Sequence, residues 1–123
     1  MEDLRIYEEL LRLGREGLPA ALATVVETAG SSPRKAGAKM LVRGDGSILG
    51  TIGGGRVEAE VIALARTAIG DGLPRTVPFT LTEEHGFVCG GRLLVYVEPL
   101  AAPPRLLVFG AGHVGKALAA AAV

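Results

Sequence analysis

A chain of 123 residues has the size of one domain and is long enough to bury a hydrophobic core. Hydrophobic residues make up 49% of it, yet charged residues interrupt every apolar run before membrane-spanning length, and no secretory signal is recognisable. The single cysteine excludes an internal disulfide and a multi-cysteine zinc site, so we expect a reducing, cytoplasmic setting.

The formal net charge is +0, but basic residues gather in one window of the chain. A nucleic-acid-binding protein is typically basic overall and carries aromatic side chains for stacking, whereas aromatic residues are only 4% here and Trp is absent. The local excess of positive charge therefore favours a small anionic ligand. This window is residues 29–56, in which Asp45 is the one acidic residue and the basic residues are Arg34, Lys35, Lys39, Arg43 and Arg56.

The first 28 residues predict a helix, which reads as scaffold, followed by a strand. Asp3 is a suitable N-cap, and apolar residues at one-face spacing predict a helix over residues 3–14. Gly14 and Gly17 end this helix, and Pro19 prevents it from resuming. Residues 20–28 then predict a strand with a buried centre.

The segment from residue 29 to residue 37 predicts a loop, because small, hydroxyl and basic residues surround a proline. Most such loops are solvated connections. In this one, Ser31 and Ser32 offer hydroxyl donors, and Arg34 and Lys35 offer the charge that a phosphate attracts. Both interpretations stay open for the loop taken alone.

Residues 38–43 and 47–52 predict a β-hairpin, because an Asp-Gly pair between them favours a tight turn. Antiparallel pairing brings the residues before Lys39 close to those after Ile52. We therefore expect the basic loop and the glycines that follow Ile52 to emerge at the same end of one sheet, as one site.

Three consecutive glycines, Gly53, Gly54 and Gly55, stand between this hairpin and a helix predicted over residues 56–69. Strand, glycine turn and helix is the layout that points backbone N–H groups and a positive dipole end at an anion. A sharp structural corner is the alternative. The dipole accounts for Glu58 in the first turn, and contact with a ligand hydroxyl or polar ring edge is a lesser possibility.

Residues 75–82 predict an edge strand, because Pro78 interrupts it, and residues 92–98 predict a second strand. His85 reads as a residue of the loop between them. Cys89 is followed by Gly90 and Gly91, which leave its sulfur unshielded. The sequence is equally compatible with a buried thiol and with a reactive or metal-touching thiolate.

Residues 101–104 read as a linker, and residues 105–123 as the start of a second domain. Gly110, Gly112 and Gly115 form a dinucleotide fingerprint between a strand and an alanine-rich helix. Only 19 residues follow the linker, whereas a βαβ unit needs about 30. We expect a truncated Rossmann-like strand and helix, whose uncovered apolar faces favour a homodimer.

In order along the chain, these motifs resemble those of the XdhC/CoxI family, accessory proteins of molybdenum hydroxylases such as xanthine dehydrogenase. The matching motifs are Gly30–Arg34, Gly37–Met40, Gly50–Glu58, Cys89–Gly91, Glu98–Pro99 and Phe109–Gly115. The resemblance implies a maturation factor or chaperone rather than an enzyme. Such a protein binds molybdenum cofactor, as molybdopterin or its dinucleotide form, protects it during sulfuration, and delivers it to an apo molybdenum hydroxylase.

The resemblance and the local chemistry together define one candidate cofactor site on an α+β domain spanning residues 1–100, with two helices on a mostly antiparallel sheet. The glycine turn and the basic side chains are expected at the phosphate end, and Cys89 at the molybdenum end. Many family members have cysteine where this chain has Arg56. The candidate residues are Ser31, Ser32, Arg34, Lys35, Lys39, Gly53, Gly54, Gly55, Arg56, Glu58, Cys89, Gly90 and Gly91.

The implied partners are an apo molybdenum hydroxylase and, beside it, a cysteine desulfurase or nucleotidyltransferase; neither nucleic acid nor a membrane span is expected. Two other functions stay open. The fingerprint at Gly110–Gly115 is compatible with a fragment of an NAD(P)-linked oxidoreductase, although so short a tail makes NAD(P) binding unexpected. The second open function is a non-catalytic interaction domain, in which the glycines serve only as sharp turns of the backbone.

Overall fold

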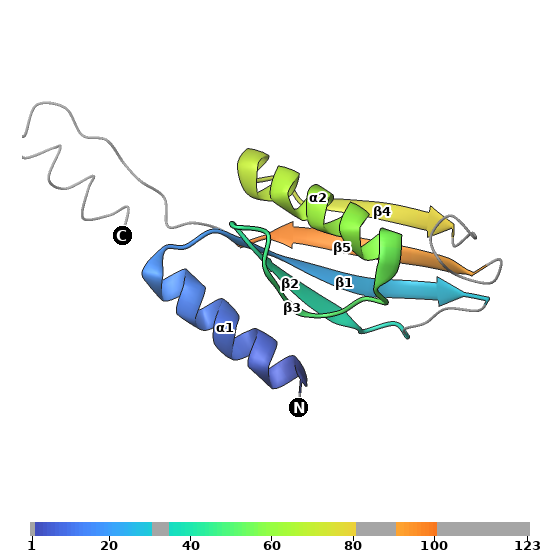
Figure 1. Cartoon of the computed structure of the whole chain (residues 1–123), viewed down its shortest axis with the longest axis horizontal. Coiled ribbons are helices and arrows are strands. Elements are labelled where there is room, and N and C mark those ends of the chain that lie inside the picture. Colours follow the sequence, from blue (N-terminus) through green and yellow to red (C-terminus); the bar gives the residue numbers. More distant parts are fainter. Residues whose placement is uncertain (1, 31–34, 81–90, 101–123) are drawn as a thin grey trace, which may run out of the picture.

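The computed structural model describes residues 2–30, 35–80 and 91–100, which form an antiparallel five-stranded sheet with a helix on each face (Figure 1). The predicted α+β class is confirmed, while the expected linker and Rossmann-like segment lie outside the described residues. The sheet order is β3-β2-β1-β5-β4. The elements are α1 (Glu2–Glu16), β1 (Ala20–Ala29), β2 (Lys39–Arg43), β3 (Ile48–Gly50), α2 (Gly55–Asp71), β4 (Arg75–Thr80) and β5 (Arg92–Pro99).

The predicted hairpin is formed by β2 and β3, which pair Met40 with Gly50 and Val42 with Ile48. Its turn is closed by Asp45, whose Oδ1 accepts hydrogen bonds from the backbone nitrogen of Ser47 at 2.8 Å and from its Oγ at 2.6 Å. The second strand is shorter than the predicted 47–52. The ladder stops at Gly50, which has a positive φ of 83°, and the chain then leaves the sheet.

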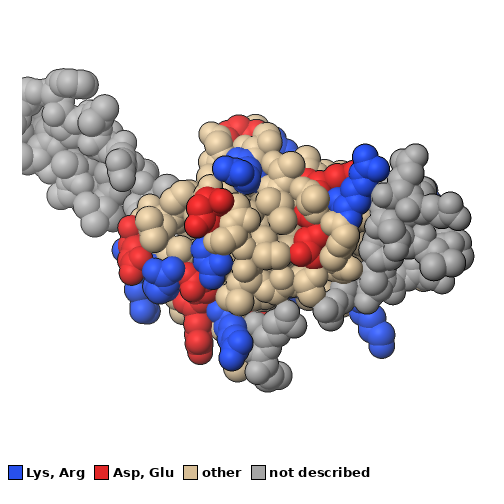
Figure 2. All heavy atoms as spheres, viewed as in Figure 1, with Lys and Arg blue, Asp and Glu red and all other residues tan. Residues whose placement is uncertain are grey.

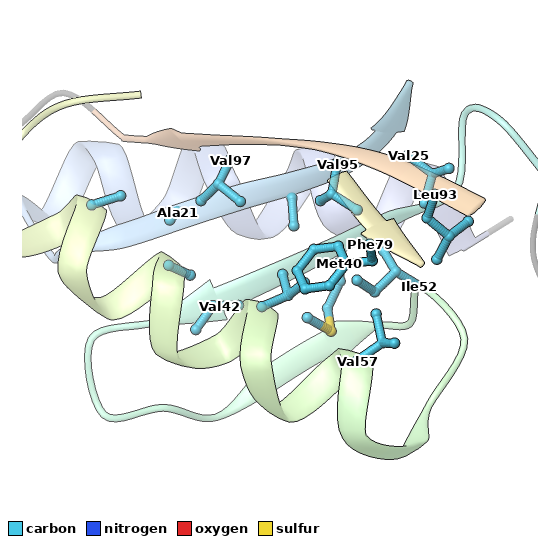
Figure 3. Close-up of a cluster of buried hydrophobic side chains, with 14 residues drawn as sticks. Ala21, Val25, Met40, Val42, Ile52, Val57, Phe79, Leu93, Val95 and Val97 are labelled. Carbon is cyan, nitrogen blue, oxygen red and sulfur yellow. The ribbon is translucent and has the colours of Figure 1, made fainter. Parts of the chain in front are cut away.

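Helix α2 covers one face of the sheet and supplies the larger core. Its residues at helical spacing, Val57, Val61, Ala65 and Ala68, are buried. They meet strand residues that alternate along β1, β2 and β5, as Figure 3 shows for Val25, Met40 and Leu93 among others. This face, which we call the α2 face, is therefore sealed by apolar packing.

Helix α1 packs on the opposite sheet face, over β2 and β3. Its side chains Ile6 and Leu13 form a smaller cluster with Ala20, Leu22 and Leu41. The helix continues past Gly14, where the sequence predicted its end, and closes at Gly17, whose φ of 68° is left-handed. A left-handed glycine is the usual helix terminator, and Gly14 instead lies within the last turn, where an added Cβ would be 3.9 Å from Leu100.

Strand β4 lies at the sheet edge, as Pro78 predicted, because a proline has no N–H to donate to a second neighbour. Strand β1 contains an irregularity that the sequence did not predict. Val25 pairs with Val95, but Glu27 pairs with Leu94, so the register shifts by one residue between them. No helix within the described ranges is long and apolar enough to cross a membrane.

Candidate functional site

Three segments with candidate residues meet at one end of the sheet, on the right in Figure 1. Strand β3 ends at Gly50 opposite Met40, so the glycine turn begins next to the start of β2. Strand β1 ends at Ala29 opposite Arg92, where β5 begins. As predicted, the chain enters β2 from the basic loop at the same end of the sheet at which it leaves β3 for the glycine turn, although residues 31–34 of that loop lie outside the described residues. The start of β5, next to Gly91, lies at the same end.

The glycine turn adopts a backbone conformation that other residues rarely tolerate. Gly53, Gly54 and Gly55 have positive φ values of 139°, 78° and 67°. Gly54 is the N-cap of α2, and no side chain caps the helix there. A Cβ added to Gly54 would meet no heavy atom of the described residues within 4 Å, so among these residues its outward side is open. These glycines form a turn that is strained for any other residue and accessible to a ligand.

Glu58 holds this turn from inside. Its Oε2 accepts hydrogen bonds from Thr51 Oγ1 at 2.6 Å and from the backbone N–H of Gly54 at 2.8 Å. Thr51 Oγ1 in turn accepts the N–H of Gly53 at 3.1 Å. The helix dipole was sufficient to explain Glu58 from sequence, but the structure gives it a second role, as the acceptor that closes the turn.

Sequence reasoning missed Thr51 altogether. The available signal was a glutamate near the start of the helix that can reach back to the N-cap N–H, one position later than in a capping box, with a hydroxyl residue before the glycines. The network also changes which donors face a ligand. The N–H groups of Gly53 and Gly54 are engaged, so an anion at this end of α2 is left with those of Gly55, Arg56 and Val57, which have no acceptor within the helix.

The basic side chains are divided between different places. Arg56 lies in the first turn of α2 and is exposed, as is Lys35 in the loop. Lys39 Nζ donates to the carbonyl oxygen of Gly37 at 2.8 Å, and its register partner is Thr24 on the face away from α2. Of the expected cluster, the described residues place only Arg56 directly at the glycine turn.

Arg43 lies at the other end of β2, with Nε 3.8 Å from Glu9 Oε1. The basic window in the sequence is therefore not one surface patch. Figure 2 shows Lys and Arg interspersed with Asp and Glu on the visible face of the described residues.

Several candidate residues lie outside the described residues: Ser31, Ser32, Arg34, His85, Cys89, Gly90 and the fingerprint glycines Gly110, Gly112 and Gly115. Gly91 is described and is buried just before β5. Over residues 2–30, 35–80 and 91–100, no three His, Cys, Asp or Glu side chains come together in a way that would hold a metal ion.

The sequence profile of the XdhC and CoxI family matches residues 13–80, which include the basic loop, the hairpin and the glycine turn. The chain belongs to the XdhC and CoxI family. The resemblance inferred from the ordered motifs is confirmed by this match.

Two curated relatives carry functional names. A protein of Bacillus subtilis named as a probable xanthine dehydrogenase subunit is 37% identical over 93 residues, which cover 70% of this chain and 28% of the relative. The molybdenum cofactor insertion chaperone PaoD of Escherichia coli is 38% identical over 107 residues, covering 85% of this chain and 33% of the relative.

The fold has a match among solved structures. A crystal structure of a protein named xanthine dehydrogenase, from Bacillus halodurans, superposes with a TM-score of 0.72 at 32% identity. The match covers 84% of this chain and 32% of that protein. The chain thus spans about a third or less of the length of these relatives.

Proposed function

We propose that this chain is the cofactor-binding part of an accessory protein for a molybdenum hydroxylase of the xanthine dehydrogenase type. The observation that carries the proposal is the positive-φ glycine turn at the start of α2, inside the region that matches the family. A backbone without Cβ atoms at a helix N-terminus is suited to a phosphate group. The relative named a molybdenum cofactor insertion chaperone supports this choice of ligand.

The residues present fit a phosphate at one side of the turn. Among the described residues the outward side of Gly54 is open, and the first-turn N–H groups of Gly55 and Arg56 have no acceptor inside the helix. The exposed Arg56 guanidinium adds a charge-assisted bond, worth roughly 1.5–3 kcal/mol before solvent screening. Glu58 supplies no bond to the phosphate, because an ionised carboxylate only accepts hydrogen bonds, here from Thr51 and Gly54.

We also propose which further residues bind the cofactor, how the protein handles it, and how the protein assembles. Ser31, Ser32, Arg34, Lys35 and Lys39 add donors to the phosphate end, and Cys89, with Gly90 and Gly91, approaches the molybdenum end, where a soft sulfur ligand is chemically apt. The cofactor is cargo: it is kept from solvent during sulfuration and passed to the apo-enzyme. A homodimer in the cytoplasm is the proposed assembly.

Direct binding tests the proposal. The purified chain is mixed with molybdenum cofactor released from a molybdenum enzyme, and the protein fraction is assayed for molybdenum and for oxidised pterin fluorescence. We expect both to be retained together, and Arg56→Ala to weaken retention severalfold. Arg66→Ala, an exposed arginine later on the same helix, is the matched control and should bind like the wild type.

Retention of neither component by the wild-type chain would overturn the proposal. Equal retention of the cofactor by Arg56→Ala and Arg66→Ala would show that the cofactor does not bind at the glycine turn. A parallel incubation with NAD, in which the chain retains NAD but no pterin from the cofactor mixture, would favour the oxidoreductase alternative.

A further inference from the structure

A hollow of about 310 Å³ lies at the end of β1, β5 and β4, on the part of the sheet that α1 leaves uncovered. Its size falls at the lower end of the range for small-molecule sites. Six of its nine lining residues belong to two rows of cross-strand neighbours on the face opposite α2. These rows are Glu27–Leu94–Pro78 and Ala29–Arg92–Thr80.

The bulge in β1 places a carboxylate in this hollow. Val25 is fully buried on the α2 face, so strict alternation would turn Glu27 into the core next to Leu93. The register shift instead puts Glu27 opposite Leu94, on the open face, and leaves Val26 46% exposed. Bulges near binding sites commonly re-aim one side chain in this way.

The hollow combines an apolar floor with two unpaired opposite charges. Leu94 and Pro78 offer a flat apolar surface, and Thr80 adds a hydroxyl group. Neither Glu27 nor Arg92 forms a hydrogen bond or ion pair in the structure that covers residues 2–30, 35–80 and 91–100. They are diagonal neighbours on two adjacent strands, a relation that separates the backbones by roughly 7–8 Å.

We propose that this hollow binds a planar heterocycle with a 2-amino-4-oxopyrimidine edge. Such an edge presents an exocyclic amine, a ring N–H and a carbonyl oxygen in a row. The Glu27 carboxylate accepts the two N–H bonds side by side, the Arg92 guanidinium donates to the carbonyl oxygen, and the ring lies on Leu94 and Pro78.

Pterin and guanine share this edge, so the inference rests on the proposed function for its choice of ligand: the pterin, or the base of a guanine dinucleotide form. Binding here is separate from phosphate binding at the glycine turn, because the turn leads into α2 and the hollow opens on the other face.

The test uses the full chain and measures dissociation constants for free pterin, guanosine, adenosine and cytidine by equilibrium dialysis. Pterin or guanosine should bind. The tighter of the two shows whether the hollow takes the pterin of the cofactor or the guanine base of its dinucleotide form. Adenosine and cytidine lack the edge and should bind at least tenfold more weakly. Glu27→Gln should weaken binding about tenfold or more, since one N–H then faces an amide donor. Arg92→Gln is a second variant, should the first one fail to fold.

Glu98→Gln is the matched control, because Glu98 is an exposed carboxylate on the same face of β5 but outside the hollow. The inference is overturned if neither pterin nor guanosine binds, if all four compounds bind alike, or if the hollow variants bind like Glu98→Gln. Those failures leave the proposed function standing when the wild-type chain still retains molybdenum cofactor. Pterin binding by a chain that retains no molybdenum would instead overturn the proposed function alone.

Discussion

The Glu58 carboxylate accepts the backbone N–H of Gly54 at 2.8 Å, so helix α2 begins with one of its own anions at its positive end. That carboxylate also accepts the Thr51 hydroxyl, which fixes its position next to the three glycines. An anionic ligand that approaches the outward side of the turn therefore meets both the helix dipole and a nearby like charge. The two effects have opposite signs, and substitution separates them.

Glu58→Gln should strengthen phosphate binding at the turn severalfold. The amide oxygen keeps an acceptor for the Gly54 N–H, while the negative charge is removed. Titration of the amide resonances with inorganic phosphate at low salt measures the change, because salt screens exposed charges. Weaker binding by the variant would mean that the carboxylate itself contacts the ligand, the lesser possibility raised by the sequence.

Thr51→Val should destabilise the domain by about 1–2 kcal/mol, because it removes the bond to Glu58 and leaves the Gly53 N–H without its acceptor. The midpoint of urea unfolding measures the loss. Thr67→Val is the control: its hydroxyl bonds to the Ala63 carbonyl on an exposed part of α2, and its loss should be well below that of Thr51→Val. Equal losses would show that the Thr51 network contributes nothing particular to the turn.

Three glycine-to-alanine substitutions should separate backbone strain from steric overlap. Gly54→Ala has open space, but its φ of 78° and ψ of −174° lie in a region used almost only by glycine, which predicts a loss of roughly 1–3 kcal/mol. Gly50→Ala adds overlap to a φ of 83°, since its Cβ would lie 2.6 Å from the Lys39 carbonyl oxygen, and should be the most destabilising. Gly70→Ala, in an open part of α2, should stabilise by about 0.5–1 kcal/mol.

Urea unfolding gives all three values. Substitution of Gly54 by a β-branched residue is a poorer probe of ligand binding, because its strain would lower stability at the same time. Equal unfolding midpoints for the Gly50 and Gly70 variants would contradict the backbone geometry of the turn.

Asp71 should make stability depend on pH in the acid range. The hydrogen bond from the Arg75 side chain, with the N–H of Leu73, holds the pKa of Asp71 below its ordinary value. A lowered pKa stabilises the folded state above the ordinary pKa, and that contribution is lost as the pH falls through the folded value. Asp71→Asn should therefore unfold more easily than the wild type at pH 6, and the difference should shrink as the pH falls below the ordinary pKa of an aspartate.

Arg75→Gln removes the partner of Asp71 and should show the same convergence in acid. Urea midpoints at several pH values between 2 and 6 measure both variants. Parallel curves for the wild type and Asp71→Asn would show that this ion pair does not contribute to folding.

The elements were predictable where local chemistry decides the outcome. The Asp45-Gly46 turn specified the hairpin, and Pro78 specified an edge strand, because each acts within a few residues of the chain. The site was less predictable. Placement of Lys39 depends on its pairing with Thr24, a long-range contact that puts its register position on the face away from α2.

The bulge at Glu27 was hidden for the same reason. The run Val25, Val26, Glu27, Thr28 shows no glycine or proline to mark an irregularity, and β-branched residues suit a regular strand equally well. What turns Glu27 outward is the fit of β1 against β5, which the sequence does not show locally. Likewise, Thr51 and Glu58 are seven residues apart and meet only because the glycines between them turn the chain back.

The two outermost strands resist polymerisation of the sheet. Strand β3 has only three residues, which is too little backbone to recruit a strand from another molecule. Strand β4 has six, but Pro78 interrupts its row of donors. Short or proline-interrupted borders of this kind discourage amyloid-like growth, in which each new strand is templated by an unpaired one. A sheet with such borders can therefore be held at high concentration with little tendency to form fibrils through its edges.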